Sequence, residues 1–352
     1  MDVISDRKTD RNQYFDLVKG IAIILVVFGH CIQYGSGDSY LSGEYFFDNI
    51  VFKAIYSFHM PLFAIVSGYL FYYSISRRSA GECIKKQIFG LVIPIVVWSV
   101  AKSLGEYGIK AVLLRRPIEI AWAVDIIKTC ITELWFLWAM FWCSLAVVLI
   151  KKFFKDRIAI YILVAICLLW FPNILGASKC IFMYPYYIGG YLCHKFSVIE
   201  KISAKGKASL GILAGAVWCV MLCFYEKSHY IYITGTCLWG NNIAQQMGID
   251  VFRWTIGAAG SIAVLYAASL VTSYQNRLIS LCAMLGTKTM GIYIISNYAN
   301  VFVLKQLTKG IGFSWLAIIL ETVIMLAFTV AVSWVLGRNK ITRQVFLGGR
   351  MS

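Results

Sequence analysis

The sequence predicts an all-α, polytopic membrane protein with about ten transmembrane helices. Three observations support this fold class. The 352 residues are 60% hydrophobic and 14% charged, and the mean hydropathy of +0.72 is well above that of an ordinary water-soluble domain. Apolar runs of about 20 residues, the length that crosses a bilayer as a helix, recur along nearly the whole chain. These runs do not alternate as the strands of a membrane β-barrel would.

Ten apolar segments, separated by short charged or polar intervals, are the expected spans. They are residues 14–34, 49–75, 87–104, 126–150, 158–172, 179–195, 208–225, 250–272, 289–305 and 314–336. The polar intervals between them are too short to enclose a hydrophobic core of their own. Residues 1–352 are therefore expected to form one transmembrane domain without a separate soluble domain.

The net charge of +16 is distributed in short basic clusters between the apolar segments. Such clusters are typical of cytoplasmic loops, whereas a nucleic-acid-binding protein would gather them on a polar domain. Placing both termini in the cytoplasm puts most basic residues on that side of a bacterial cytoplasmic membrane. The expected outer loop 105–125 is an exception, because it carries Lys110, Arg115 and Arg116. Most of the 11 cysteines lie inside apolar segments, where they are expected to pack rather than to bind metal or form disulfides.

The first segment carries three ionisable side chains on one predicted helix face. Lys19 and His30 are 11 residues apart, which is about three helical turns or roughly 16 Å, and Asp16 lies one turn before Lys19. A neutral imidazole can accept a proton from a hydroxyl near pH 7. His30 is therefore a candidate catalytic base, with Lys19 and Asp16 as its catalytic companions. A hydrogen-bonded interfacial histidine and a lysine that reaches the lipid headgroups are the structural alternatives.

Four further residues are candidates for binding a substrate. His59 lies in an apolar segment that Pro61 interrupts, and a core histidine bonded to a neighbouring carbonyl is the alternative to a ligand there. Glu133 is followed by the aromatic Trp135 near the expected outer surface. An indole face beside a carboxylate suits a sugar ring, although an interfacial aromatic belt explains the tryptophan equally well. Arg253 stands at the outer start of the eighth segment, where it is either a ligand or a membrane anchor. His194 and His229, in or beside loops, receive no role.

A basic cluster lies between the second and third segments, on the expected cytoplasmic side. It consists of Arg77, Arg78, Lys85 and Lys86. Charge-assisted hydrogen bonds from these side chains could hold the phosphates of a nucleotide-like group such as that of acyl-CoA. Charges that only set the topology are the alternative. The chain has no Walker loop, dinucleotide fingerprint, zinc-ligand spacing or Gly-x-Ser-x-Gly elbow, so neither a metal nor a permanently bound cofactor is expected.

Five motifs in order resemble those of the membrane acyltransferase-3 family, whose bacterial members O-acylate cell-surface and secreted glycans. The first joins Lys19 to His30 across a ten-residue gap. The others are Phe58-His59-Met60-Pro61-Leu62-Phe63 with Ser67-Gly68-Tyr69, Leu134-Trp135-Phe136-Leu137, Tyr187-Ile188-Gly189-Gly190-Tyr191-Leu192, and Leu285-Gly286-Thr287 with Gly291-Ile292-Tyr293. The resemblance extends over essentially the whole chain.

This resemblance implies a function, a co-substrate and a catalytic residue. An acyl group, most simply acetyl, would pass from cytoplasmic acyl-CoA to a hydroxyl of a glycan or polysaccharide acceptor, with His30 as the catalytic residue. Two departures from the family pattern stand out. Gln87-Ile88-Phe89-Gly90 follows Lys85 and Lys86 where the family often has paired arginines, and Ser296 replaces a frequent histidine. A carrier that exports a small glycan or acyl compound is the leading alternative, and a membrane sensor is a second one.

Overall fold

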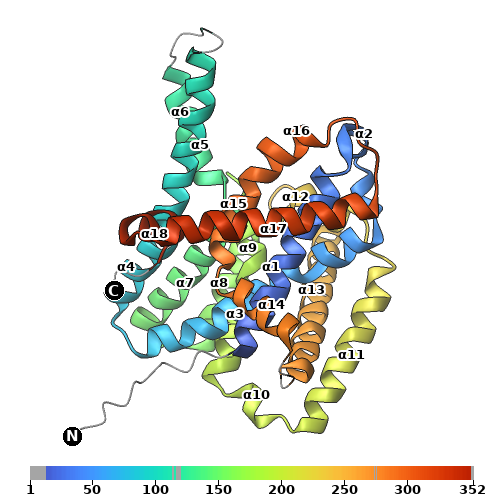
Figure 1. Cartoon of the computed structure of the whole chain (residues 1–352). Helices are drawn as coiled ribbons and strands as arrows, with labels where there is room; N and C mark the ends of the chain where they lie inside the picture. The colour runs from blue at the N-terminus through green and yellow to red at the C-terminus, as the bar shows by residue number, and fades with distance from the viewer. Residues whose placement is uncertain (1–12, 113–114, 116–119, 273, 275, 350–352) are drawn as a thin grey trace, which may run out of the picture.

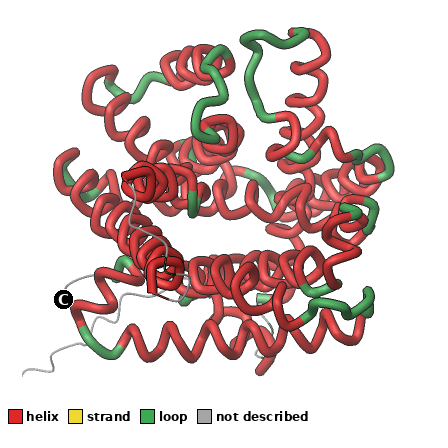
Figure 2. Tube along the Cα trace, turned by 90° about the horizontal axis from the view of Figure 1, so that it is seen from above, coloured by secondary structure: helices red, strands yellow, loops and turns green. Residues whose placement is uncertain are grey.

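The computed structural model describes residues 13–112, 115, 120–272, 274 and 276–349, and all regular structure in these ranges is helical (Figures 1 and 2). The predicted all-α class is therefore confirmed for the described residues. Seven helical stretches are long and apolar enough to cross a membrane. They are α1 (Gln13–Tyr34), α3 (Ile50–Ser76), the continuous helix Ala80–Val112, α7 (Trp135–Phe154), α11 (Ala204–Leu222), α13 (Ile243–Val271) and α17 (Trp315–Gly337). This makes the chain a multi-pass membrane protein.

The continuous helix Ala80–Val112 consists of α4 (Ala80–Gln87), a π-helical turn η2 (Ile88–Val92) and α5 (Ile93–Val112). Ser79 and Glu82 form a capping box that begins α4. Two consecutive helical stretches form an eighth candidate span if they are counted together as one bent helix. These stretches, Arg277–Gly286 (α14) and Thr289–Leu307, meet at an angle of 76°. The second one contains α15 (Thr289–Ala299), π-helical η4 (Asn300–Leu304) and α16 (Lys305–Leu307).

Besides the ninth expected span, which belongs to the bent pair, two of the ten expected spans differ from these long apolar helices. Helix α8 (Ile158–Leu169) has 12 residues, or about 18 Å, so the helix alone is shorter than the hydrocarbon layer. Helix α9 (Ala177–Lys195) has 19 residues and packs between α3 and α7. Because much of α9 is buried by protein rather than lipid, it can carry polar residues that lower its average hydropathy.

The fourth expected span and the expected outer loop 105–125 were placed wrongly. The chain turns at Leu134, whose φ of 49° separates α6 (Ile120–Thr132) from α7, so residues 126–132 do not belong to the span. Most of the expected loop is helical, because α5 continues to Val112 and α6 begins at Ile120. These two helices pack against each other as a hairpin that projects from the body of the protein (Figure 1).

Short elements complete the described chain. After α1 come α2 (Gly37–Ser42) and the 3₁₀ turn η1 (Tyr45–Phe47), and after α9 comes α10 (Val198–Lys201). A 3₁₀ turn η3 (Lys227–His229) and α12 (Ile231–Thr234) lie between α11 and α13. The last helix, α18 (Lys340–Leu347), packs against α5 and α17.

Helix α1 lies at the centre of the bundle, in contact with α3, α13, α14, α15 and α17. It approaches α14 backbone to backbone: a Cβ atom on Gly20 would lie 1.8 Å from the carbonyl oxygen of Cys282, and one on Gly286 would lie 1.7 Å from that of Asp16. Only glycine fits at both positions, as is common where membrane helices pack closely. This contact fixes the position of the helix that carries Lys19 and His30.

Candidate active site

Two cavities lie along α1 and share part of their walls. We name them the histidine cavity, of about 250 Å³, and the basic cavity, of about 700 Å³. Val26 and His30 of α1 line the first, whereas Lys19 and Ile23 of the same helix line the second. The side chains of Met60 and Tyr293 line both cavities. The two cavities are therefore neighbours, separated at Met60 and Tyr293.

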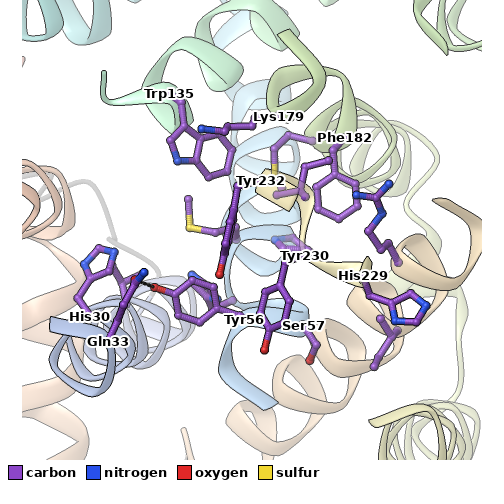
Figure 3. A pocket seen from close by; sticks show the side chains of 18 of the residues that line it. His30, Gln33, Tyr56, Ser57, Trp135, Lys179, Phe182, His229, Tyr230 and Tyr232 are labelled. Atoms are coloured by element: carbon purple, nitrogen blue, oxygen red, sulfur yellow. Dashed lines mark hydrogen bonds between the residues drawn. The ribbon is translucent and has the colours of Figure 1, made fainter. Parts of the chain in front are cut away.

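His30 lies on the wall of the histidine cavity, beside Gln33 and near Tyr56 (Figure 3). The carboxamide oxygen of Gln33 accepts a hydrogen bond of 3.5 Å from the Tyr56 hydroxyl. The Nδ1 atom of His30 is buried and has no hydrogen-bond partner in the protein. A buried ring nitrogen without a partner is costly unless a ligand or water satisfies it, so this atom is available to a group in the cavity.

His59 reaches the same cavity from α3, two residues before Pro61. Its Nδ1 atom donates a 2.7 Å hydrogen bond to the carbonyl oxygen of Ile55. A carbonyl oxygen only accepts hydrogen bonds, so Nδ1 carries a proton, and in the neutral ring Nε2 then keeps its lone pair. His59 therefore has a fixed tautomer with an acceptor nitrogen, whereas His30 is not held in this way.

Aromatic and cationic side chains form the rest of the histidine cavity. Figure 3 shows Trp135, Lys179 and Phe182 on one side, with Tyr230 and Tyr232 in the middle of the view. His229 also lines the cavity and accepts a 2.9 Å hydrogen bond at Nδ1 from the backbone N–H of Glu226. Burial lowers the pKa of His229 below its ordinary value, so the ring is neutral at pH 7. The cavity thus offers faces for a ring and several polar groups around it.

The basic cavity gathers three of the four cluster residues. Arg78, Lys85 and Lys86 line it together with Lys19, and Ser74 accepts 3.0 Å hydrogen bonds from both Arg78 and Lys86. Arg77 does not line the cavity and instead lies 6.0 Å from the ring centre of the exposed Tyr73. Gln344, Gly348 and Gly349 close one wall from the end of α18. The structure therefore separates Arg77 from the other three residues.

Lys19 and Asp16 form an ion pair of 2.7 Å on α1. Asp16 is buried, whereas Lys19 is partly exposed and lines the basic cavity. The helical spacing predicted that the two side chains share a face of α1, one turn apart. Lys19 and His30 lie about three helical turns apart on α1, and each lines a different cavity.

The remaining predicted ligands divide into two groups. Trp135 and Arg253 line the histidine cavity with His59. Glu133 lines neither cavity and forms an ion pair with Lys102 of α5. The turn at Leu134 explains the difference, because α6 ends at Thr132, Glu133 lies in the turn, and α7 starts at Trp135. The role of Glu133 as a sugar ligand stays a prediction that this geometry does not favour.

Several cavity residues were not predicted from the sequence. They are Gln33, Tyr56, Lys179, His229, Tyr230 and Tyr232. Lys179 could have been found, because it is an ionisable side chain at the start of an apolar segment and such groups are costly in lipid. His229, Tyr230 and Tyr232 carry no local signal, since the fold brings the segment between α11 and α13 to α3 and α13.

Comparison with known proteins defines the class of this membrane protein. The acyltransferase domain family model matches residues 12–338. The chain therefore belongs to the membrane acyltransferase-3 family.

Two curated relatives agree with this assignment. The Nodulation protein NolL of Sinorhizobium fredii is 30% identical over 302 residues, which cover 82% of this chain and 78% of that protein. The Nodulation protein NolL of Mesorhizobium japonicum is 31% identical over 186 residues, covering 52% of this chain and 48% of the relative. No solved structure matches the chain.

Proposed function

We propose that this acyltransferase is a membrane-embedded O-acyltransferase. It would move an acyl group, taken here as acetyl, from cytoplasmic acyl-CoA to a hydroxyl of a surface or exported glycan. One observation carries the proposal: the basic cavity and the histidine cavity share Met60 and Tyr293 as walls. Membership of the acyltransferase family supports acyl transfer as the reaction.

In this proposal the basic cavity holds the donor. Arg78, Lys85 and Lys86 bind its phosphates by charge-assisted hydrogen bonds, and Lys19 adds a positive charge nearer the shared wall. The roughly 16 Å between Lys19 and His30 suits an extended pantetheine arm. The arm would pass Met60 and Tyr293, and the unbranched methionine side chain can change rotamer to admit it.

The histidine cavity then contains both reacting groups. His30 acts as general base and takes the proton from the acceptor hydroxyl, whose oxygen attacks the thioester carbonyl carbon. The carbon–sulfur bond breaks as the new ester bond forms, and the proton on His30 passes to the departing thiolate. His59, with a fixed tautomer, orients the acceptor through its Nε2 atom.

The topology in this proposal has ten spans in the bacterial cytoplasmic membrane, with both termini in the cytoplasm. Helix α9 and the bent pair α14–α15 cross the membrane in addition to the seven long helices. Helix α8 crosses together with the segment 170–176 that follows it. This arrangement puts the basic cavity on the cytoplasmic side, where acyl-CoA is present, and Lys179 and Arg253 on the outer side.

A direct experiment separates this enzyme from a carrier. Purified protein in nanodiscs is incubated with acetyl-CoA, radiolabelled in the acetyl group, and a panel of methyl glycosides. The enzyme releases one free CoA thiol for each labelled glycoside. A carrier of acyl compounds leaves the thioester intact. If the protein binds acetyl-CoA but the thioester stays intact with every glycoside, the proposal is contradicted.

A further inference from the structure

The histidine cavity is lined by cationic and neutral side chains. Lys179 and Arg253 line it, and none of the lining residues is an aspartate or glutamate. A cleft lined by one sign of charge attracts the opposite sign, and low-dielectric walls strengthen that attraction. The cavity is therefore suited to a ligand that brings a negative charge.

Arg253 is almost completely buried, with 2% of its surface exposed. Its Nη2 atom donates to Asp250 and to the carbonyl oxygen of Gly235, and Asp250 also accepts hydrogen bonds from Thr236 and Gln246. The Nε and Nη1 atoms of Arg253 are buried and have no partner. Buried guanidinium donors without acceptors are costly, so these two nitrogens mark a place for acceptor oxygens.

Lys179 supplies a positive charge that no neighbouring acid offsets. Its ammonium group lies 5.9 Å from the ring centre of Trp135, and within the described chain no carboxylate forms an ion pair with it. Arg253 lies 5.8 Å from the ring centre of Phe182, which is three residues after Lys179 on α9. Each cation thus lies beside an aromatic side chain of the cavity wall, Lys179 beside Trp135 and Arg253 beside Phe182.

The size of the histidine cavity limits what this aromatic and cationic wall can hold. At about 250 Å³ it is smaller than the roughly 300–1,000 Å³ pockets of drug-sized ligands, so it suits a single sugar ring rather than an oligosaccharide. Trp135 and Phe182 offer ring faces on which the C–H side of a sugar can stack. A carboxylate attached to that sugar is the kind of acceptor that the free guanidinium donors and the ammonium group both lack among the described residues.

We infer that the acceptor sugar carries a carboxylate, as a uronic acid does, and that Lys179 and Arg253 bind it. This inference rests on the proposed function, because it names the substrate class of the same site. The role of these two residues is recognition, since His30 handles the reacting hydroxyl. The charge on the sugar would also orient the ring, so that one hydroxyl faces His30.

Binding of three matched sugars tests the inference without any catalysis. Equilibrium binding to the purified full-length protein in nanodiscs is measured for methyl β-D-glucuronide, methyl β-D-glucoside and glucose 6-phosphate. We expect the glucuronide to bind about ten-fold more tightly than the glucoside. Equal affinities for these two sugars would overturn the inference, and tighter binding of the phosphate would overturn the choice of a carboxylate.

Two lysine variants locate the effect. Lys179→Gln should weaken glucuronide binding about ten-fold and leave glucoside binding unchanged. Lys128→Gln is the matched control, because Lys128 is exposed on α6, outside the histidine cavity. Arg253→Lys keeps the charge but loses the fork of donors, so it should weaken glucuronide binding. Thermal unfolding measurements check that this variant is folded. An unchanged glucuronide affinity in Lys179→Gln would refute the assignment.

The two proposals fail in different ways. If glucuronide binds through Lys179 while no thioester is consumed with any sugar, the anion site stands and the enzymatic function fails. If sugars are acylated with no preference for a carboxylate, the enzymatic function stands and this inference fails.

Discussion

The histidine cavity and the basic cavity differ in size, in the number of cations and in the elements that form them, although they lie along one helix. The basic cavity is almost three times as large, and three of its four cations, Arg78, Lys85 and Lys86, come from one short stretch of chain around α4. The histidine cavity is assembled from α1, α3, α7, α9, α13, α15 and the segment between α11 and α13. Two of its ionisable side chains, His59 and Arg253, are held by hydrogen bonds to backbone carbonyls.

This difference suggests a division of labour. A partly exposed cluster of charges can bind phosphates without fixing a reacting atom, because a lysine ammonium on its long side chain acts on phosphate as a point charge. Proton transfer needs groups held within hydrogen-bond distance of one hydroxyl, so it requires the more constrained cavity. We therefore assign binding of the acyl-CoA donor to the basic cavity and the chemical step to the histidine cavity.

The largest expected effect is at His30. His30→Ala should lower acetyl transfer about 10²–10⁴-fold, because the base is lost, with little change in acetyl-CoA binding. Both quantities are measured on purified protein, by product formation and by equilibrium binding. His194→Ala is a suitable control, since His194 stacks on Tyr69 outside both cavities. Full transfer by the His30 variant would remove the catalytic role.

The next effect tests the shared wall. Met60→Trp should lower transfer about a hundred-fold, because a bulky, rigid side chain misplaces or blocks the pantetheine arm between the cavities. Met60→Leu, which is similar in volume, should retain most activity. Product formation and acetyl-CoA binding are compared in both variants. Unchanged transfer in Met60→Trp would mean that the donor does not use this route.

A smaller effect is expected in the basic cavity. Arg78→Gln combined with Lys85→Gln should raise the KM for acetyl-CoA about ten-fold and leave kcat nearly unchanged, because charged hydrogen bonds to phosphate are lost. Arg77→Gln is the matched control outside the cavity and should change KM less than about two-fold. If Arg77→Gln raised the KM as much as the double substitution, the cluster would attract acetyl-CoA only through its overall positive charge and would not form a specific binding site.

The smallest functional effect is expected at Glu133. Because Glu133 is paired with Lys102, Glu133→Gln should lower the free energy of unfolding by about 1–3 kcal/mol while the KM for sugar is unchanged. Thermal unfolding and kinetics together separate the two effects, and a double-mutant cycle with Lys102→Met measures the pair itself. A raised KM at normal stability would return Glu133 to the sugar site.

Local periodicity predicted the parts of the fold that depend on one helix at a time. The helical spacing in the first segment was enough to place Lys19 and His30 on a common face, and both line cavities. The break at Leu134 gave no sequence signal, because a leucine with a positive φ looks like any apolar residue in a span. The bend between α14 and α15 likewise depends on packing against α1 and α17.

Long-range contacts account for what the sequence did not predict in the site. Glu133 looks like a sugar ligand beside Trp135, and only the partner 31 residues earlier, Lys102, changes that interpretation. Arg253 looks like an interfacial anchor until its burial against Asp250 is seen. His229 reaches the histidine cavity only because the segment between α11 and α13 folds over it.

The sidedness of the reaction tests the central claim most directly. Proteoliposomes with a single protein orientation receive radiolabelled acetyl-CoA on the face of the basic cavity and methyl glycosides only on the opposite face. The account predicts labelled glycoside on the opposite face, formed by the wild-type protein and absent with His30→Ala. Labelled product only when donor and acceptor are on the same face would contradict a passage that joins the two cavities.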